Sequence, residues 1–162
     1  MLTRTEHNVQ VDSKQPQTLT GPCASDLESP QTTSRRIRIL SVDDDIEAAE
    51  SIKIVLGIEG FEVVTAHSGM DALARLASDP PDVVLLDIRM PDLSGFTVAQ
   101  RIRNMGHARL KLVALSSIDF DLDSTAPELA FFDAVCMKPV RVGDLIDVIR
   151  HLSGTPEADQ RV

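Results

Sequence analysis

Acidic side chains follow two apolar runs of this sequence at the point where each run ends. Three aspartates, residues 43–45, follow the run IRILSV, and Asp87 follows the run VVLL. Carboxylates that converge repel one another unless a cation compensates them. Oxygen ligands without histidine or cysteine select a hard ion, and Mg²⁺ suits a site with few carboxylates. A carboxylate nucleophile beside Mg²⁺ is the equipment of phosphoryl transfer to aspartate.

Two other polar groups follow later apolar runs. Ser116 is the first of a serine pair after LKLVAL, and Lys138 follows AVCM. A lysine supplies a positive charge and a serine supplies a hydroxyl donor, and together they suit a tetrahedral anion held over Asp87. Taken singly, each residue has an ordinary explanation as a helix cap, a turn or a solvated charge. Their meeting at one place would distinguish a site from these alternatives.

The elements around these residues predict a sheet that brings them together. Continuous apolar runs indicate buried parallel strands, and apolar residues at helical spacing, Ile46 and Met70 among them, indicate helices. The predicted strands are residues 37–42, 61–66, 83–86, 110–115 and 134–137, and the predicted helices are 45–58, a segment capped by Ser68, a segment after Ser94, and 142–152. The alternation predicts an α/β fold with helices on both faces. Parallel strands place their carboxyl ends at one edge, so the acids, the serine and the lysine should gather there.

Composition limits the class of protein. The chain has 162 residues, 43% of them hydrophobic and 3% aromatic, which predicts one domain with an aliphatic core. Its net charge of −9 argues against nucleic-acid binding. Two cysteines make no disulfide framework or metal set, and neither a signal peptide nor a membrane span is visible. These features predict a cytoplasmic protein that acts away from the membrane.

The two ends differ from the middle of the chain. Residues 1–34 and 153–162 are polar and lack apolar periodicity, so we expect disordered tails that flank a folded domain over residues 35–152. The segment LDSTAPELAFF, before the predicted fifth strand, is the weakest prediction, because Pro127 breaks a helix unless it lies in the first turn.

Four motifs in this order and spacing resemble the receiver domain of bacterial two-component response regulators. They are ILSVDDD, VVLLDIRMPDLSG, LVALSS and VCMKPV, and the resemblance covers roughly residues 35–152. The resemblance implies a flavodoxin-like fold, a five-stranded parallel sheet of order 2-1-3-4-5.

The resemblance also implies roles for the acids. Asp87 would be the phosphoacceptor. Asp43 and Asp44 would hold Mg²⁺, with Asp87 and the backbone carbonyl of Arg89 completing the protein ligands. No organic cofactor is implied.

The remaining motif residues would contact the phosphoryl group. Ser116 would donate its hydroxyl, Lys138 would form an ion pair, and a cis peptide bond would precede Pro139. The donor would be a phosphohistidine of a sensor histidine kinase or a histidine phosphotransfer protein. The chain would then be a signalling phosphoacceptor rather than an enzyme, and a monomer or weak dimer.

The sequence departs from the family where its signal is usually communicated. Val135 occupies the position of a switch aromatic, and Phe131 and Phe132 replace the usual small residues before the last strand. Only ten residues follow the last predicted helix, so we expect no output domain in this sequence.

Three other hypotheses compete with a functional receiver. A phosphatase of the haloacid dehalogenase type needs D-x-D-x-[TV], but the motif that begins at Asp43 places Glu47 at its last position. A degenerate receiver could serve as a binding scaffold, although its chemical residues are all present. A DNA-binding regulator is disfavoured by the net charge and by the lack of an output domain.

Overall fold

The computed structural model describes residues 35–107, 109–117 and 127–154. The predicted N-terminal tail, residues 1–34, and most of the predicted C-terminal tail, residues 155–162, lie outside the described residues. None of the helices in the described part has the length and apolar character needed to cross a membrane.

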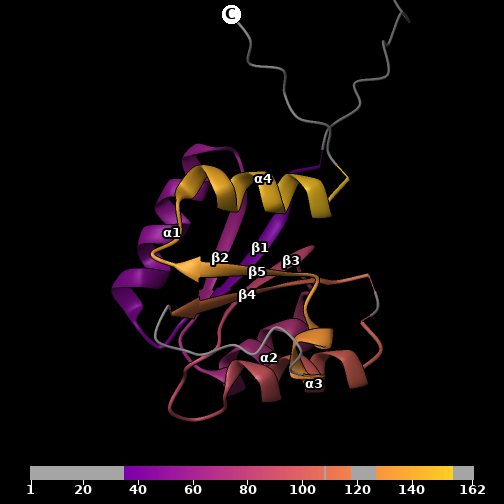
Figure 1. Cartoon of the computed structure of the whole chain (residues 1–162). Helices are drawn as coiled ribbons and strands as arrows, with labels where there is room; N and C mark the ends of the chain where they lie inside the picture. The colour runs from indigo at the N-terminus through magenta and orange to yellow at the C-terminus, as the bar shows by residue number, and fades with distance from the viewer. Residues whose placement is uncertain (1–34, 108, 118–126, 155–162) are drawn as a thin grey trace, which may run out of the picture. The chain divides into compact units, whose positions relative to one another are not determined.

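Strands and helices alternate along the described chain (Figure 1). The strands are β1 (Arg38–Val42), β2 (Glu62–Ala66), β3 (Val83–Asp87), β4 (Lys111–Ser117) and β5 (Ala134–Lys138). The helices are α1 (Ile46–Ile58), α2 (Gly69–Ser78), α3 (Gly95–Asn104) and α4 (Val142–Leu152), with a 3₁₀ helix, η1 (Pro127–Phe131), before β5. All strands are parallel and lie in the order β2-β1-β3-β4-β5, which confirms the predicted fold.

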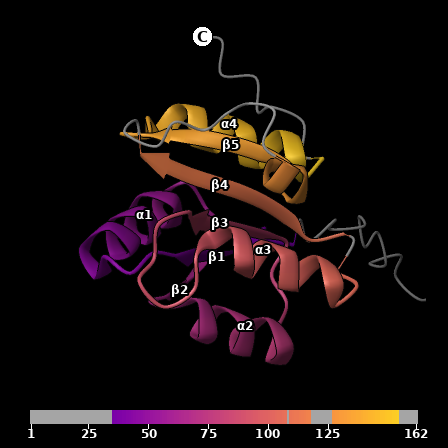
Figure 2. The same cartoon turned by 60° about the horizontal axis from the view of Figure 1, so that its bottom comes forward.

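Helices cover both faces of the sheet, as predicted. Helices α1 and α4 lie on one face, and α2 and α3 lie side by side on the other (Figures 1 and 2). Alternate residues of each strand point to opposite faces, which divides the core into two clusters. Among the buried hydrophobic side chains of the described residues, Phe61 is the one aromatic, so the core is aliphatic as expected.

Three helices begin at the capping residues that the sequence indicates. Asp45, Ser68 and Ser94 precede α1, α2 and α3, and each side chain accepts a backbone N–H of the first turn at 3.0 to 3.3 Å. A capping oxygen pairs an N–H that has no partner within the helix. These caps define the residue at which each helix begins.

Two of the apolar residues whose spacing predicted α1 and α2 face solvent. Ile46 and Met70 are each 59% exposed, whereas the buried side chains of α2 include Ala72 and Leu76. Apolar spacing predicts that a helix forms, but it does not by itself decide which of the apolar residues is buried.

Strand β4 is longer than predicted. It continues through Ser117 because β5 pairs with its last residues, Ser116 opposite Met137 and Ser117 opposite Lys138. The uncertain segment before β5 forms η1, with Pro127 as its first residue, a position where the missing N–H costs no hydrogen bond. Residues 118–126 lie outside the described residues.

Candidate functional site

Three carboxylates meet at the carboxyl edge of the sheet. Asp43 follows β1 and Asp87 ends β3, and these strands are paired neighbours with Val42 opposite Leu86. One oxygen each of Asp43, Asp44 and Asp87 lies within 4.8 Å of the others. Asp43 is 2% exposed and Asp87 is 7% exposed, whereas Asp44 faces solvent. The predicted convergence of the acids is therefore present.

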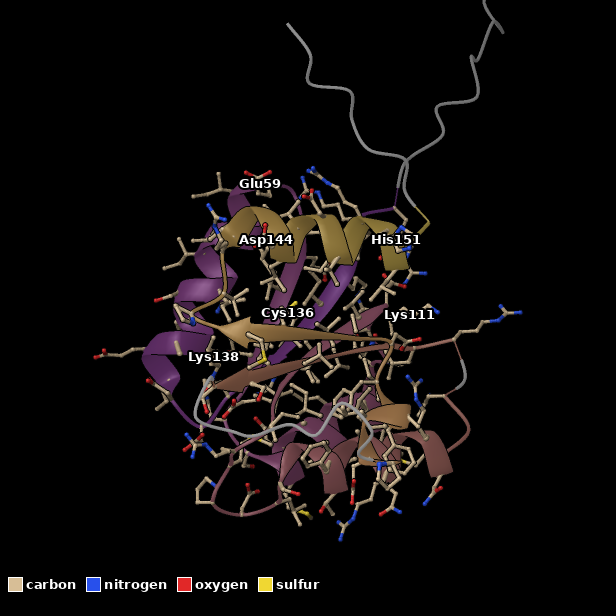
Figure 3. All side chains as sticks on the ribbon, in the orientation of Figure 1. Glu59, Lys111, Cys136, Lys138, Asp144 and His151 are labelled. Carbon is tan, nitrogen blue, oxygen red and sulfur yellow. The ribbon has the colours of Figure 1, made fainter. Side chains whose placement is uncertain are left out.

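Lys138 connects two of these acids. Its Nζ donates to Asp43 Oδ2 at 2.8 Å and lies 3.0 Å from Asp87 Oδ1. The lysine comes from the end of β5, and Figure 3 shows it at the arrowhead of that strand, at the end opposite Lys111. The bond from Lys138 to Pro139 is cis, as the resemblance implies.

The pKa values of Asp87 and Lys138 reflect this arrangement. Burial raises the pKa of Asp87, and the charges of Asp43 and Asp44 add to that rise, so together they outweigh the bond from Lys138. Burial by itself would lower the pKa of Lys138, but its bonds to Asp43 and Asp87 outweigh burial and raise it. Among the described residues, one ammonium group is thus shared by two carboxylates with the third, that of Asp44, close by, so the cluster carries more negative than positive charge.

Ser116 is fully buried near the end of β4, the strand beside Asp87. Its hydroxyl donates to the carbonyl oxygen of Ser117 at a long 3.4 Å. The side chain of Arg89 donates from Nη2 to Ser117 Oγ at 2.8 Å. Sequence reasoning assigned only the Arg89 carbonyl and missed this contact, although a serine pair opposite a strand-end arginine could have suggested it. The carbonyl role stays a prediction.

Glycine at position 95 is required by a close backbone approach. A Cβ there would lie 2.3 Å from the carbonyl oxygen of Asp87 and 2.9 Å from Ile88 Cα. The Gly95 N–H also donates to the Ile88 carbonyl at 2.9 Å. Asp92, in the same loop, accepts the N–H of Gly69 at 3.0 Å, which ties the loop to the start of α2. The loop after β3 therefore folds tightly against the backbone of Asp87.

The residues in which the sequence departs from the receiver pattern differ in burial. Val135 is 41% exposed on β5. Phe131 and Phe132 are partly buried against the core beneath α3, where the ring of Phe132 meets that of Phe96 edge to face at 6.0 Å. The aromatic side chains before β5 therefore pack against the core at α3, whereas Val135 is open to solvent.

The donor set fits a hard divalent cation. The cluster of Asp43, Asp44 and Asp87 offers carboxylate oxygens, two of them from buried residues. Such ligands suit Mg²⁺, which binds through one or two carboxylates and keeps several waters. Because the three carboxylates outnumber the ammonium group of Lys138, a bound cation would be electrostatically favourable.

Comparison with known proteins is consistent with this geometry. Residues 39–150 match the family model of the response regulator receiver domain. Response regulator MprA of Mycobacterium tuberculosis and that of Mycobacterium avium are each 36% identical over 116 residues. Each match covers 72% of this chain and 50% of the relative, so the chain spans about half the length of these curated relatives.

Solved structures share the fold. Response regulator TrrA from Thermotoga maritima, in complex with Mg²⁺ and BeF, matches with a TM-score of 0.66 and 32% identity over 72% of this chain and 98% of that one. A receiver domain protein from Clostridium thermocellum matches with a TM-score of 0.67 and 29% identity over 73% of this chain and 94% of that one.

Proposed function

The chain belongs to the response regulator receiver domain family, and we propose that it accepts a phosphoryl group from a phosphohistidine onto Asp87, with Mg²⁺ as its cofactor. The observation that carries this proposal is the placement of Asp87, a buried strand-end carboxylate beside two other acids and bonded to Lys138. The family membership adds support, because the match spans every residue of the site.

The proposed chemistry is a displacement at phosphorus. A carboxylate oxygen of Asp87 attacks the phosphorus atom, and the phosphorus–nitrogen bond breaks with its electron pair going to the imidazole. Lys138 Nζ, already 3.0 Å from Asp87, would remain as the counter-ion of the transferred group. The Ser116 hydroxyl makes only a 3.4 Å bond to a neighbouring carbonyl, so little would be lost when it turns to donate to a phosphoryl oxygen.

Asp43, Asp44 and Asp87 would hold the Mg²⁺, together with the carbonyl of Arg89. When bound, the ion would offset the carboxylate charge and the charge of the phosphoryl oxygens. TrrA, which shares the fold, was solved with Mg²⁺ and BeF, and this likeness supports the choice of metal.

The proposed donor is a sensor histidine kinase or a histidine phosphotransfer protein, and the proposed role is signalling. The cluster itself argues against a degenerate receiver, because a binding scaffold has no need of converging buried acids and a shared lysine. A haloacid dehalogenase activity is not favoured, because the family model that matches is that of a receiver.

Phosphorylation with a small phosphodonor tests this function. The full chain, incubated with phosphoramidate and Mg²⁺, should acquire one acid-labile phosphate, and chelation of the metal should prevent labelling. Asp87→Asn should abolish the label. Asp45→Asn is the matched control, because asparagine also caps α1, and it should be labelled like the wild type. Wild-type labelling of Asp87→Asn would contradict the assignment.

A further inference from the structure

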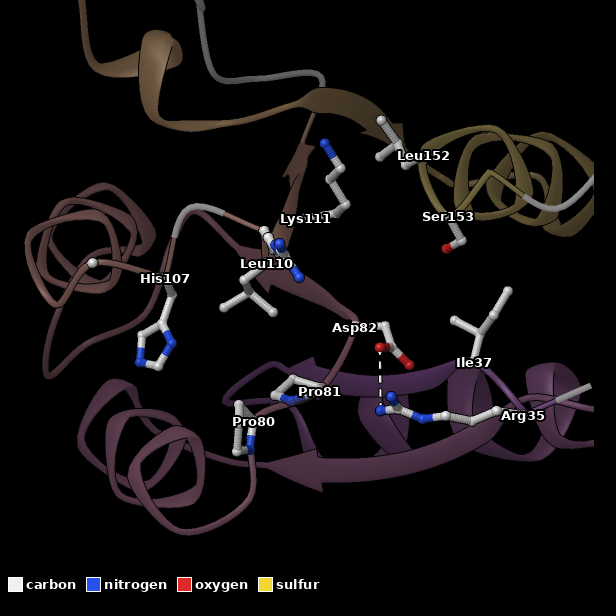
Figure 4. A pocket seen from close by; sticks show the side chains of 12 residues that line it. Arg35, Ile37, Pro80, Pro81, Asp82, His107, Leu110, Lys111, Leu152 and Ser153 are labelled. Carbon is white, nitrogen blue, oxygen red and sulfur yellow. Dashed lines mark hydrogen bonds and ion pairs between the residues drawn. The ribbon is translucent and has the colours of Figure 1, made fainter.

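A large hollow lies at the amino edge of the sheet, opposite the carboxylates. Its volume is about 730 Å³, within the range of small-molecule sites. Its walls are formed by described residues just before β1 and β3, on either side of position 108 between α3 and β4, and at the end of α4 (Figure 4). The polar and charged side chains that line it include those of Arg35, Asp82, Arg109, Lys111 and Ser153.

The lining is positively charged, although the whole chain carries −9. Lys111 Nζ lies 3.4 Å from Asp133 Oδ1, but Asp133 is outside the lining and is shared with Arg103 at 2.7 Å. Arg35, Arg109 and Lys111 bring three positive charges to the lining itself, against the single carboxylate of Asp82 among the described lining residues. That carboxylate is already compensated, because it lies 3.3 Å from Arg35 Nη2 and accepts the N–H of Arg38 at 2.8 Å. A surplus of positive charge in a concave site favours an anion.

The hollow also has an apolar wall and a polar atom without a partner. Pro80, Pro81, Leu110 and Leu152 line it beside the charged groups. Ser153 lines it too, and its hydroxyl oxygen is buried with no hydrogen-bond partner among the described residues. A buried hydroxyl of this kind ordinarily pairs with a water or a ligand.

We propose that this hollow binds a phosphorylated small molecule of mononucleotide size. Arginine and lysine are the side chains that recognise phosphate, and more than one of them suits its double charge. The proline and leucine side chains would contact the apolar face of a ring, and the Ser153 side chain would rotate so that its buried hydroxyl bonds a polar atom of the same ligand. The site is separate from Asp87 and does not depend on phosphoryl transfer there.

Calorimetric titration of the full chain with AMP tests the proposal. AMP should bind saturably with a dissociation constant of about 1 mM or tighter. Adenosine and inorganic phosphate, titrated separately, should each bind more weakly, because each offers one part of the ligand. Added salt should weaken AMP binding, because it screens the charges. Asp87→Asn should bind AMP like the wild type, which separates this proposal from the phosphoacceptor function.

Variants identify the site. Arg109→Gln should weaken AMP binding on the order of tenfold, the value of one charge-assisted contact. Arg101→Gln is the matched control, because Arg101 is exposed on α3 outside the lining, and it should leave binding unchanged. Ser153→Ala should weaken binding without loss of stability, because its hydroxyl has no partner to lose. Absence of saturable binding, or equal weakening by Arg101→Gln and Arg109→Gln, would overturn the proposal.

Discussion

Two aspartates at opposite edges of the sheet show opposite pKa shifts. At the amino edge, burial would raise the pKa of Asp133, but the N–H of Leu112 at 2.8 Å and the guanidinium of Arg103 at 2.7 Å outweigh burial and lower it. At the carboxyl edge, burial raises the pKa of Asp87, and the shared ammonium of Lys138 does not reverse the rise. The two carboxylates have the same chemistry and different neighbours.

The difference separates a structural acid from the proposed phosphoacceptor. Asp133 has three partners among the described residues, Leu112, Arg103 and Lys111, and Arg103 also donates to the carbonyl of Phe131, so this acid links η1 and β4 to α3. Asp87 faces Asp43 and Asp44, and the one ammonium partner that it has in the described part of the chain is shared with Asp43. Its charge is therefore under-compensated by the protein, which leaves it ready for a cation and for an electrophile.

The largest expected effect on stability comes from removal of the structural acid. Asp133→Ala should lower the free energy of unfolding by about 2 to 3 kcal/mol, because it leaves the Leu112 N–H unpaired in the interior and frees Arg103. Asp87→Asn, in metal-free protein near neutral pH, should instead raise the free energy of unfolding. Urea denaturation in the presence of chelator measures both. Destabilisation of similar size by the two variants would remove the distinction.

Metal affinity should separate the acids of the carboxyl edge from their neighbour in sequence. Asp43→Asn or Asp44→Asn should weaken Mg²⁺ binding on the order of 10- to 100-fold, since each removes a ligand or a group that orients one. Asp45→Asn keeps the cap of α1 and should leave Mg²⁺ affinity unchanged. Calorimetric titration with Mg²⁺ shows which of these aspartates hold the ion. Loss of affinity in Asp45→Asn alone would show that the assigned acids are wrong.

The pH dependence of stability should have opposite signs at the two edges. The lowered pKa of Asp133 gives a stabilising contribution that is present above the ordinary value of 3.8 and is lost as pH falls through the folded-state pKa. The raised pKa of Asp87 gives a contribution that is present below 3.8 and is lost as pH rises through its folded-state pKa. Thermal unfolding across acidic pH, without metal, measures both contributions. Asp133→Asn should lose the gain in stability with rising pH, and Asp87→Asn should lose the fall in stability with rising pH.

Two glycines allow a smaller test of the same comparison. Gly95→Ala should cost about 1 to 3 kcal/mol, because the new Cβ meets the Asp87 backbone, which cannot yield cheaply. Gly106→Ala, near the amino edge, meets no atom within 4 Å and should cost about 1 kcal/mol through its φ of +83° alone. Phosphorylation should slow in the first variant and not in the second. Equal rates in both would show that the close approach at Gly95 does not position Asp87.

The smallest expected change is at β5. Val135 is stiff about its first torsion and much smaller than a ring, so it cannot report phosphorylation by a large rotation. On addition of beryllofluoride and Mg²⁺, amide chemical shifts should change most around Asp87 and Ser116 and less around Val135. Changes around Val135 as large as those around Ser116, unaffected when Phe131 and Phe132 are both replaced, would contradict this expectation.

Much of this protein was predictable from local signals in its sequence. Strand runs, helix spacing and the caps at Asp45, Ser68 and Ser94 each depend on a few consecutive residues. The parallel alternation then placed Asp43, Asp87 and the other strand-end residues at one edge, because parallel strands share their polarity.

Tertiary structure alone decided which of these residues touch. Lys138 and Asp43 are 95 positions apart, and their bond depends on strand order and on a side chain that spans the strand ends. The need for glycine at 95, the clamp of Asp133 and the hollow lined by Ser153 likewise arise where distant segments pack together. Such contacts depend on the course of several loops and on the length of side chains from distant segments. No short stretch of sequence determines them.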